Sequence, residues 1–261
     1  MKSPEKVINY IVNWLKEYAI NNNINGFVVG VSGGVDSALT SLLCAKTNLP
    51  VLCLEMRIHQ EKNQISRGLN HINWLKNKFN NVKFKSIPLT NVFDAFKNTI
   101  TENKFNEKEL LSLANTRSRI RMMTLYYFST LNNYLVAGTG NKVEDFGIGF
   151  YTKYGDGGVD ISPIADLLKS EVYILAKRLG VLKEIIEASP TDGLWNDNRS
   201  DEDQIGATYK ELESVMKNKL KNLKKTKREL EVTTIFNTFN SRNKHKMVSI
   251  PICKIPNKLK S

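Results

Sequence analysis

The alternation of apolar and polar positions along the first ninety residues predicts a layered α/β fold. Apolar runs over 27–31, 50–56 and 82–88 have the length of buried strands. Between them, residues 38–46 and 62–80 place apolar side chains at helical spacing. Strand and helix alternate as in βαβ units, which indicates a doubly wound, mostly parallel sheet with helices on both faces. Ligands bind such sheets at the carboxyl ends of the strands.

The pattern of the remaining chain extends this alternation. Further helices are predicted over 4–21, 92–100 and 107–132, around Lys169 up to Gly180, and over 203–216 and 218–230, with another strand over 134–138. Residues 147–160 are rich in glycine and polar side chains, which predicts an irregular loop that positions function. A tail containing His245 and Lys246 closes the chain. Because no repeat or low-complexity linker is present, we expect residues 1–261 to form one domain.

A glycine-rich turn follows the first of the apolar strands. It is Ser32-Gly-Gly-Val-Asp-Ser37, and the helix 38–46 comes directly after it. Glycines allow close approach of the backbone, and the amides at a helix start point toward negative charge, so the turn predicts an anion site. No lysine follows the second glycine, which separates this turn from the GxxxxGK[ST] phosphate loop. A carboxylate beside phosphates needs a cation between them, so Asp36 predicts Mg²⁺.

Composition restricts the class of protein without naming a substrate. The 261 residues are 41% apolar, which is enough for a sizeable core and argues against wholesale disorder. Cys44, Cys53 and Cys253 are widely spaced and form no CxxC pair, which favours a reducing compartment over disulfides or zinc. The first residues lead into an amphipathic helix, and no apolar stretch approaches membrane-spanning length. We therefore expect a cytoplasmic protein.

The net charge of +12 would suit an anionic substrate or RNA. Much of it lies in 217–228, a stretch that has seven basic residues and no acid. Basic charge without interleaved aromatic residues is a weak signal for nucleic acid, and a solvated helix face is the simpler interpretation. Nucleic acid is therefore an unlikely partner.

Several motifs in order carry a resemblance to a known family. They are SGGVDS, NTRSRIRM, GTGNKVED, FYTKYGDGGVDISPIADLLKSEV, SPTDGLW, SDEDQIGATY and the late His-Lys pair. SGGVDS resembles the pyrophosphate loop of the N-type ATP pyrophosphatases. The whole set closely resembles bacterial ammonia-dependent NAD synthetase, from about the first helix to the tail. The resemblance implies the Rossmann-like fold of the adenine nucleotide alpha-hydrolases.

The reaction that this resemblance implies is the ATP-dependent amidation of deamido-NAD (nicotinic acid adenine dinucleotide), the last step of NAD biosynthesis. The nicotinate carboxylate attacks the α-phosphorus of ATP, giving an acyl-adenylate and pyrophosphate, and ammonia then displaces AMP. The physics agrees, because a carboxylate has no good leaving group until it is adenylated. Mg²⁺ would neutralise charge on the departing pyrophosphate.

The resemblance also implies roles for individual residues. The ATP contacts would be Gly30, Val31, Ser32, Gly33, Gly34, Val35, Asp36, Ser37, Thr139, Lys169 and Thr191; the Mg²⁺ ligands Asp36 and Glu144; and the deamido-NAD contacts Arg119, Lys153, Asp160, His245 and Lys246. Purely structural interpretations stay open beside these. Glu144 would then cap or solvate a helix, Asp160 would be a helix N-cap, Lys153 and Lys169 would be solvated, and His245 would be a bystander.

Two segments depart from the family pattern. Met56-Arg57 stands where the family usually has Leu-Pro, so the adenosine contacts of that segment are left unassigned. The stretch from Glu144 to Lys153 is one residue longer than in many members. Residues 193–204 are the first candidate for a loop that closes over substrate.

The resemblance implies a homodimer with deamido-NAD near the interface. Free ammonia is the expected nitrogen donor, because a glutamine-using member needs an additional amidase domain with a nucleophilic cysteine. The main alternative is another ATP pyrophosphatase that modifies tRNA by thiolation or lysidine formation, which the positive charge would suit. A nucleotide-binding regulator without catalysis is a second alternative. It predicts loss of a metal carboxylate or a phosphate cation, whereas Asp36, Glu144 and Lys169 are all present.

Overall fold

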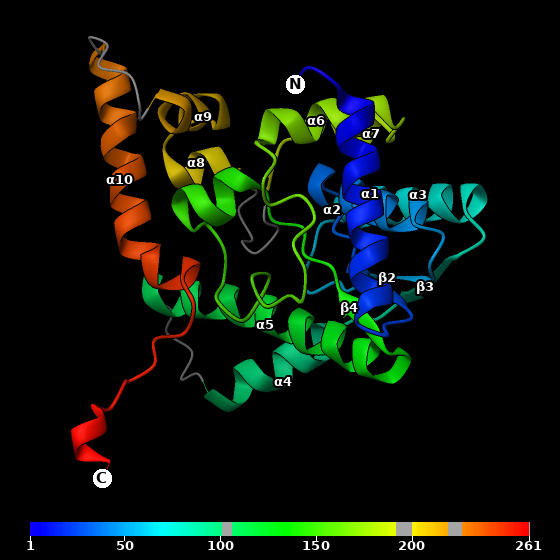
Figure 1. Ribbon diagram of the computed structural model, residues 1–261, viewed down its shortest axis with the longest axis horizontal. Helices are drawn as coiled ribbons and strands as arrows, with labels where there is room; N and C mark the ends of the chain where they lie inside the picture. Colours follow the sequence, from blue (N-terminus) through cyan, green and yellow to red (C-terminus); the bar gives the residue numbers. More distant parts are fainter. Residues whose placement is uncertain (101–105, 192–199, 219–225, 261) are drawn as a thin grey trace.

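One parallel sheet organises the chain (Figure 1). The structure, a computed structural model, describes residues 1–100, 106–191, 200–218 and 226–260. Within these residues the strands β1 (Gly26–Gly30), β2 (Val51–Glu55), β3 (Val82–Ser86) and β4 (Tyr134–Val136) lie in the order β3-β2-β1-β4, and every pairing is parallel. The predicted doubly wound parallel sheet is confirmed. The order places the carboxyl ends of β1 and β4 side by side.

Helices cover both faces of the sheet. In the part of the chain that the structure describes, the α-helices are α1 (Pro4–Asn21), α2 (Val35–Lys46), α3 (Lys62–Lys78), α4 (Thr90–Ile100), α5 (Glu107–Asn132), α6 (Lys169–Arg178), α7 (Lys183–Ile186), α8 (Asp201–Ile205), α9 (Tyr209–Asn218) and α10 (Lys227–Met247). Alternate strand residues point to opposite faces, so Phe27 and Val29 pack with α1, α2, α3, α6 and α7, while Val28 packs with α4 and α5. These β1 side chains are fully buried, each contributing roughly 1.5–3 kcal/mol of transfer free energy.

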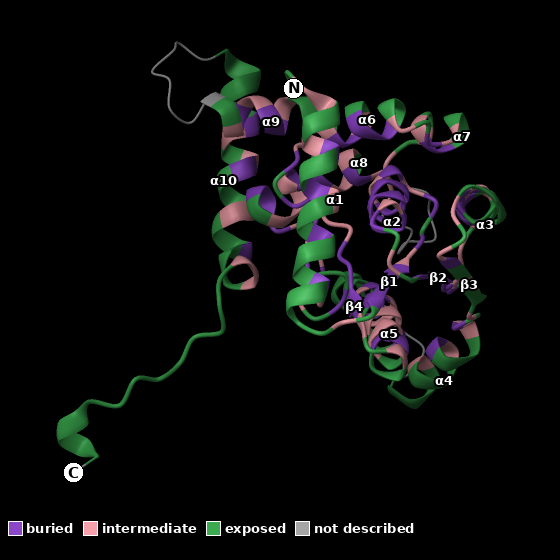
Figure 2. Ribbon diagram, turned by 45° about the vertical axis from the view of Figure 1, so that its right-hand side comes forward, coloured by how far each residue is buried: buried purple, intermediate pink, exposed green. Residues whose placement is uncertain are grey.

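A third apolar cluster determines where the late part of the chain sits, and the helices α9 and α10 that contribute to it lie beside the sheet (Figure 2). It packs Val143 and Ile148 against α8, α9 and α10 through residues such as Leu212 and Phe236. Val143 and Ile148 belong to a short π-helical segment, Val143–Ile148. The cluster therefore brings α8, α9 and α10, which come late in the chain, against the segment that follows β4.

The prediction of an irregular loop over 147–160 was wrong at its start, because the π-helical segment extends into it. The segment begins after Asn141, whose side-chain oxygen accepts the N–H groups of Val143 and Glu144 at 3.1 and 3.2 Å. It ends at Gly149, which has a φ of 62°. A β-carbon on Gly149 would lie 2.5 Å from Cβ of Asn243, so the close approach of α10 requires glycine here.

The single helix predicted over 203–216 was also wrong. α8 and α9 are separate, since Gly206 adopts the left-handed conformation with φ of 81° and ends α8. The helix predicted over 218–230 falls partly on 219–225, outside the described residues, and α10 begins only at Lys227. α10 then continues to Met247, so His245 and Lys246 lie in its last turn and not in a tail.

The chain after α10 leaves the body of the molecule (Figure 1). Residues 248–260 are exposed and contain one 3₁₀ turn, Asn257–Leu259. At the described ends of the basic stretch, Lys217 pairs with Glu213 and Arg228 pairs with Glu211, and the rest of the predicted solvated face, 219–225, lies outside the described residues. None of the described helices combines the length and hydropathy that crossing a membrane would need.

Candidate active site

The glycine-rich turn joins the end of β1 to the start of α2. α2 begins at Val35, three residues before the predicted start, so Asp36 and Ser37 belong to its first turn. The Ser32 N–H donates to Ser37 Oγ at 3.2 Å, and the two hydroxyl oxygens are 3.1 Å apart. Gly33 has a φ of 85°, and a β-carbon there would lie 2.6 Å from the Gln64 carbonyl of α3. The turn is therefore shaped by its own hydroxyls and by α3.

A cavity of about 250 Å³ opens over this turn. Its walls include every residue that the sequence assigned to ATP: Gly30, Val31, Ser32, Gly33, Gly34, Val35, Asp36, Ser37, Thr139, Lys169 and Thr191. Glu144 also lines it. The cavity lies at the carboxyl ends of β1, β2 and β4, which is where ligands bind open α/β sheets. These residues come from five segments of the chain, and the fold brings all of them to one place.

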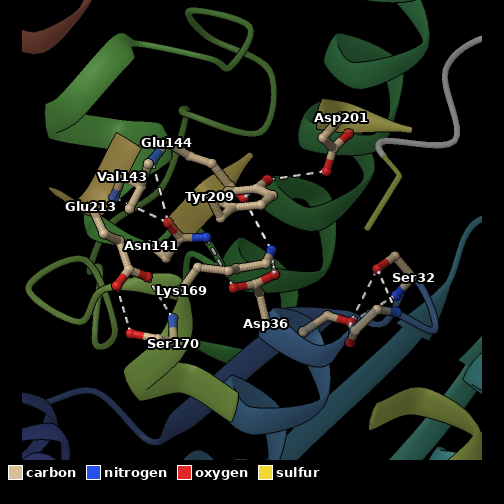
Figure 3. A network of polar contacts seen from close by, with 12 residues as sticks. Ser32, Asp36, Asn141, Val143, Glu144, Lys169, Ser170, Asp201, Tyr209 and Glu213 are labelled. Atoms are coloured by element: carbon tan, nitrogen blue, oxygen red, sulfur yellow. Dashed lines mark hydrogen bonds and ion pairs between the residues drawn. The ribbon is translucent and has the colours of Figure 1, made fainter. Parts of the chain in front are cut away.

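The ammonium of Lys169 lies between the two predicted metal carboxylates (Figure 3). Its Nζ is 2.5 Å from Asp36 Oδ2 and 3.1 Å from Glu144 Oε1, and the lysine is only 4% exposed. Burial by itself lowers the pKa of Lys169, but the negative charges of Asp36 and Glu144 outweigh it and raise the pKa above its usual value. Lys169 therefore remains a cation in the wall of the cavity, as its predicted role as a phosphate ligand requires.

Asn141 and Tyr209 complete this network, and the sequence did not single them out (Figure 3). Asn141 is fully buried, and its Nδ2 donates to Asp36 Oδ1 at 3.1 Å. The Tyr209 hydroxyl donates to Glu144 Oε1 at 2.5 Å. Both residues stand inside motifs that carry the family resemblance, GTGNKVED and SDEDQIGATY. Being uncharged, they gave no separate signal of chemistry, and their roles depend on which carboxylates they meet in space.

Asp36 and Glu144 fit a divalent metal site. Both carboxylates reach one Lys169 ammonium, so they already surround a single positive charge, and carboxylate oxygens are the hard ligands that Mg²⁺ prefers. Among the described residues, no cluster of three or more His, Cys, Asp or Glu side chains could hold a metal. A pair of carboxylates is the arrangement expected where substrate phosphates supply the remaining oxygen ligands.

Four of the five residues predicted for deamido-NAD lie together at the end of α10. The Lys153 ammonium donates to the His245 carbonyl at 2.9 Å, and Arg119 Nη2 donates to the Lys153 carbonyl at 3.3 Å. Lys246 Nζ donates to the carbonyls of Gly149 and Tyr151 at 3.0 and 2.7 Å. Burial lowers the pKa of the half-buried Lys246. These contacts place three cationic side chains around residues 149–153.

Asp160 lies apart from this group. Its Oδ2 accepts the N–H of Val136 at 2.8 Å and its Oδ1 accepts the Tyr126 hydroxyl at 3.0 Å. The alternative of a helix N-cap is wrong, because α6 begins only at Lys169 and Asp160 instead binds the end of β4. The contacts of Asp160 in this structure are those of a residue that fixes a strand end.

A second cavity connects the candidate ATP cavity with the end of α10. Asp145 and Asp156 line both cavities, and Lys246 lines the second. Burial, followed by the charges of Glu144, Asp156 and Asp36, raises the pKa of Asp145 to about 8. Burial also raises the pKa of Asp156, although Ser118 donates to its carboxylate at 2.6 Å. The sequence had not selected either carboxyl group, because their proximity is a product of the fold.

The segment after β2 also contributes to the wall. Met56 lines the ATP cavity, and its carbonyl accepts Arg121 Nε at 3.0 Å. Arg57 turns to Glu55, with Nη1 2.8 Å from Oε2. Arg121 lines the same cavity and was missed, since the sequence favoured Arg119 of the three arginines in NTRSRIRM. The predicted closing loop, 193–204, falls mainly on 192–199, outside the described residues.

Comparison with known proteins gives consistent matches. A family model described as NAD synthase matches residues 7–250. The NH(3)-dependent NAD(+) synthetase of Carboxydothermus hydrogenoformans is 38% identical over 80% of this chain and 84% of its own length. The structure of NMN synthetase from Francisella tularensis superimposes with a TM-score of 0.83 at 32% identity, covering 98% of this chain and 100% of that one. The NH3-dependent NAD synthetase of Campylobacter jejuni gives 0.77 at 30% identity, covering 97% and 100%.

Proposed function

Since the chain belongs to the NAD synthase family, we propose that it catalyses the ATP-dependent amidation of deamido-NAD by ammonia. The products are NAD, AMP and pyrophosphate, formed through an acyl-adenylate. The observation that carries the proposal is the convergence of Asp36, Glu144 and Lys169 over the glycine-rich turn in one cavity. A regulator without catalysis would have no need for this group, and the relatives give no support to a tRNA-modifying enzyme.

In the proposed reaction the turn 30–37 binds the triphosphate through backbone amides and the Ser32 and Ser37 hydroxyls. Lys169 supplies a buried cation for the phosphate oxygens, and Thr139 and Thr191, which line the same cavity, add further contacts. Such preorganised donors and charges stabilise the negative charge that develops on the departing pyrophosphate. The enzyme needs no covalent intermediate of its own, because adenylation supplies the leaving group.

Asp36 and Glu144 are the side chains that would hold Mg²⁺ in this scheme. The ion would neutralise charge on the phosphates and make pyrophosphate a better leaving group. In the structure both carboxylates contact Lys169, so its ammonium would have to turn toward the phosphates when a metal is bound. A mobile lysine stem allows that movement.

The nicotinate side of the substrate is assigned to the residues at the end of α10. Arg119, Lys153 and Lys246 are cations suited to an anionic nucleotide, and residues 149–153 with His245 form their common support. The second cavity, which adjoins the candidate ATP cavity at Asp145, would let the nicotinate carboxylate approach the α-phosphorus. Asp160 contributes by holding β4 in place.

One comparison favours a second candidate, in which nicotinic acid mononucleotide is the carboxylate that is amidated. The Francisella tularensis structure described above is named an NMN synthetase, and the match covers 98% of this chain and 100% of that one. The chemistry at the carboxylate and at ATP would be unchanged. The ratio of kcat/KM for deamido-NAD to that for the mononucleotide decides between the candidates, and a preference for the mononucleotide would replace the first.

A homodimer and a cytoplasmic location complete the proposal. Met123, Tyr127 and Leu131 are 58%, 63% and 65% exposed at intervals of four residues on α5, an apolar stripe suited to contact with a second copy. Cys44, Cys53 and Cys253 are free thiols, which suits a reducing compartment.

The test is an assay with ATP, MgCl₂, deamido-NAD and ammonium that follows AMP and ADP separately. We expect equal amounts of NAD, AMP and pyrophosphate, and no AMP without the carboxylate substrate. Release of ADP would contradict attack at the α-phosphorus. Tight binding of tRNA at physiological salt without NAD formation would instead support the tRNA-modifying alternative.

A further inference from the structure

The side chain of Tyr209 lies against two charged residues of the candidate metal site, Glu144 and Lys169 (Figure 3). Its hydroxyl is 2.5 Å from Glu144 Oε1, and the Lys169 ammonium stands 4.7 Å from the centroid of its ring. The residue is only 5% exposed. One side chain thus contacts Glu144 through its polar end and Lys169 through its aromatic face.

The position of Tyr209 is fixed by the start of α9. The Tyr209 N–H donates to Glu202 Oε1 at 2.8 Å, which ties it to α8. One turn later, the buried carboxylate of Glu213 accepts the backbone N–H and the hydroxyl of Ser170, at 2.7 and 2.6 Å. Ser170 follows Lys169 in the first turn of α6. α9 therefore contacts the segments that carry Lys169 and Glu144, and these contacts place the Tyr209 hydroxyl beside Glu144.

The Tyr209 hydroxyl has a second acceptor within reach. Its oxygen is 3.2 Å from Asp201 Oδ2, compared with 2.5 Å from Glu144 Oε1. A phenol carries one proton, so it donates to one carboxylate at a time, and the shorter distance selects Glu144. A hydrogen bond to one carboxylate oxygen leaves the other oxygen for a metal ion and fixes the orientation of the group.

We propose that Tyr209 is a positioning residue that orients the Glu144 carboxylate for the divalent metal of the nucleotide complex. Asn141 holds Asp36 in the same way from the other side, through its Nδ2. The inference rests on the proposed function, because it takes Asp36 and Glu144 as the metal ligands. It adds α9 to the elements that build the site. Tyr209 does not line the candidate ATP cavity and would act through Glu144.

The test measures metal binding directly. Mn²⁺ is titrated into the full-length protein with an ATP analogue that cannot be cleaved between the α and β phosphates, and free Mn²⁺ is followed by electron paramagnetic resonance. Because partners of metal ligands typically affect affinity by about 10–100-fold, we expect Tyr209→Phe to weaken Mn²⁺ binding within that range. Tyr10→Phe makes the same chemical change on an exposed side chain of α1 and should leave the affinity unchanged.

Two further variants separate the hydroxyl from the ring and from Glu144. Tyr209→Leu removes the aromatic face as well, so it should weaken binding more than Tyr209→Phe does. In a Glu144→Gln background, adding Tyr209→Phe should change the Mn²⁺ affinity little, since the hydroxyl acts through Glu144. In steady-state assays, Tyr209→Phe should raise the Mg²⁺ concentration for half-maximal rate more than it lowers kcat at saturating Mg²⁺.

The outcomes are distinct. Unchanged Mn²⁺ affinity in Tyr209→Phe, an equal loss in the Glu144→Gln background, or a variant that no longer folds would each overturn the positioning role. None of these results affects the proposed function, which is tested separately by the release of AMP with NAD from the unaltered protein in the assay described above.

Discussion

At the scale of single residues, the site depends on side chains whose surroundings differ sharply from water. Asp36 and Glu144 lie on either side of a buried ammonium, and Asn141 and Tyr209 hold them from outside. Away from the site, His71 of α3 is also fully buried, with Nε2 3.0 Å from Oγ of Ser41 in α2. Burial disfavours the charged form of each group unless neighbouring charges or hydrogen bonds stabilise that form.

Asp36→Ala should reduce NAD formation by roughly 100-fold or more, because the metal ion that would neutralise the phosphates loses one of its two carboxylate ligands. The fold should remain, since the side chain faces the cavity and not the apolar core. The measurements are steady-state turnover and the midpoint of thermal unfolding. Asp166→Asn, which alters a surface carboxylate with a side chain 95% exposed, is the control and should behave as the unaltered protein. Normal turnover in Asp36→Ala would exclude the metal role.

The stability of the protein should decrease as the pH falls from about 6.5 toward 4. Burial lowers the pKa of His71 to about 4, so in this range the unfolded chain takes up a proton that the folded protein excludes. This lowering of the His71 pKa from 6.5 to about 4 corresponds to about 3 kcal/mol of unfolding free energy. That stability is fully present above pH 6.5 and is lost as the pH falls toward 4.

Urea unfolding between pH 7 and 4 measures this loss, and His71→Gln should reduce the dependence on pH. His59→Gln, which changes a partly exposed histidine, is the control. An identical pH dependence in the unaltered protein and in His71→Gln would show that another group is responsible.

At the scale of elements, the contact between the glycine-rich turn and α3 determines the shape of the phosphate site. A β-carbon on Gly33 would lie 2.6 Å from the Gln64 carbonyl and 3.0 Å from the Gly68 amide. α3 therefore packs directly on the turn, and the left-handed conformation of Gly33 permits that packing. With the turn packed in this way, the first turn of α2 lines the cavity.

Gly33→Ala should destabilise the protein more than Gly180→Ala does. Both glycines have positive φ, 85° and 75°, so alanine costs on the order of 1–3 kcal/mol of backbone strain at either position. Only Gly33 has atoms of another element within reach of the added methyl group, whereas nothing lies within 4 Å of one at Gly180. Urea unfolding and ATP binding are the measurements. Equal losses of stability, with ATP affinity retained in both, would argue against the contact with α3.

At the scale of the whole molecule, three apolar clusters among the described residues fix the positions of the elements that carry the site. Two lie on the faces of the sheet, and the third joins 143–148 to α8, α9 and α10. The third cluster places Tyr209 beside Glu144 and brings the end of α10 to residues 149–153. The exposed stripe of α5 is a surface that these clusters leave uncovered within one chain.

Tyr127→Glu should convert a dimer into a monomer. Tyr127 is 63% exposed at the middle of the α5 stripe, and a buried charge without a partner strongly opposes association. Light scattering after size-exclusion chromatography gives the mass, and the full chain is 29.7 kDa. Tyr10→Glu, at a residue 73% exposed on α1, should leave the mass unchanged. An unaltered protein that runs as a monomer would remove the proposed dimer altogether.

The sequence by itself determined the parallel sheet, the helices from Pro4 to Asn132 and the glycine-rich turn. These elements follow from the spacing of apolar residues and from the positions of glycines, and both are local features of the sequence. Through the motifs that resemble ammonia-dependent NAD synthetase, the sequence also predicted that Asp36, Glu144 and Lys169 lie in one site.

Only the tertiary structure decided the parts that depend on distant partners. The π-helical turn at Val143–Ile148 and the length of α10 follow from packing in the third cluster, which no local pattern reveals. Asp160 binds the end of β4, and Tyr209 becomes a neighbour of Glu144, because the chain returns to the carboxyl edge of the sheet. A hydrogen bond between residues sixty-five positions apart depends on a fold, and the spacing of residues along the chain carries no record of it.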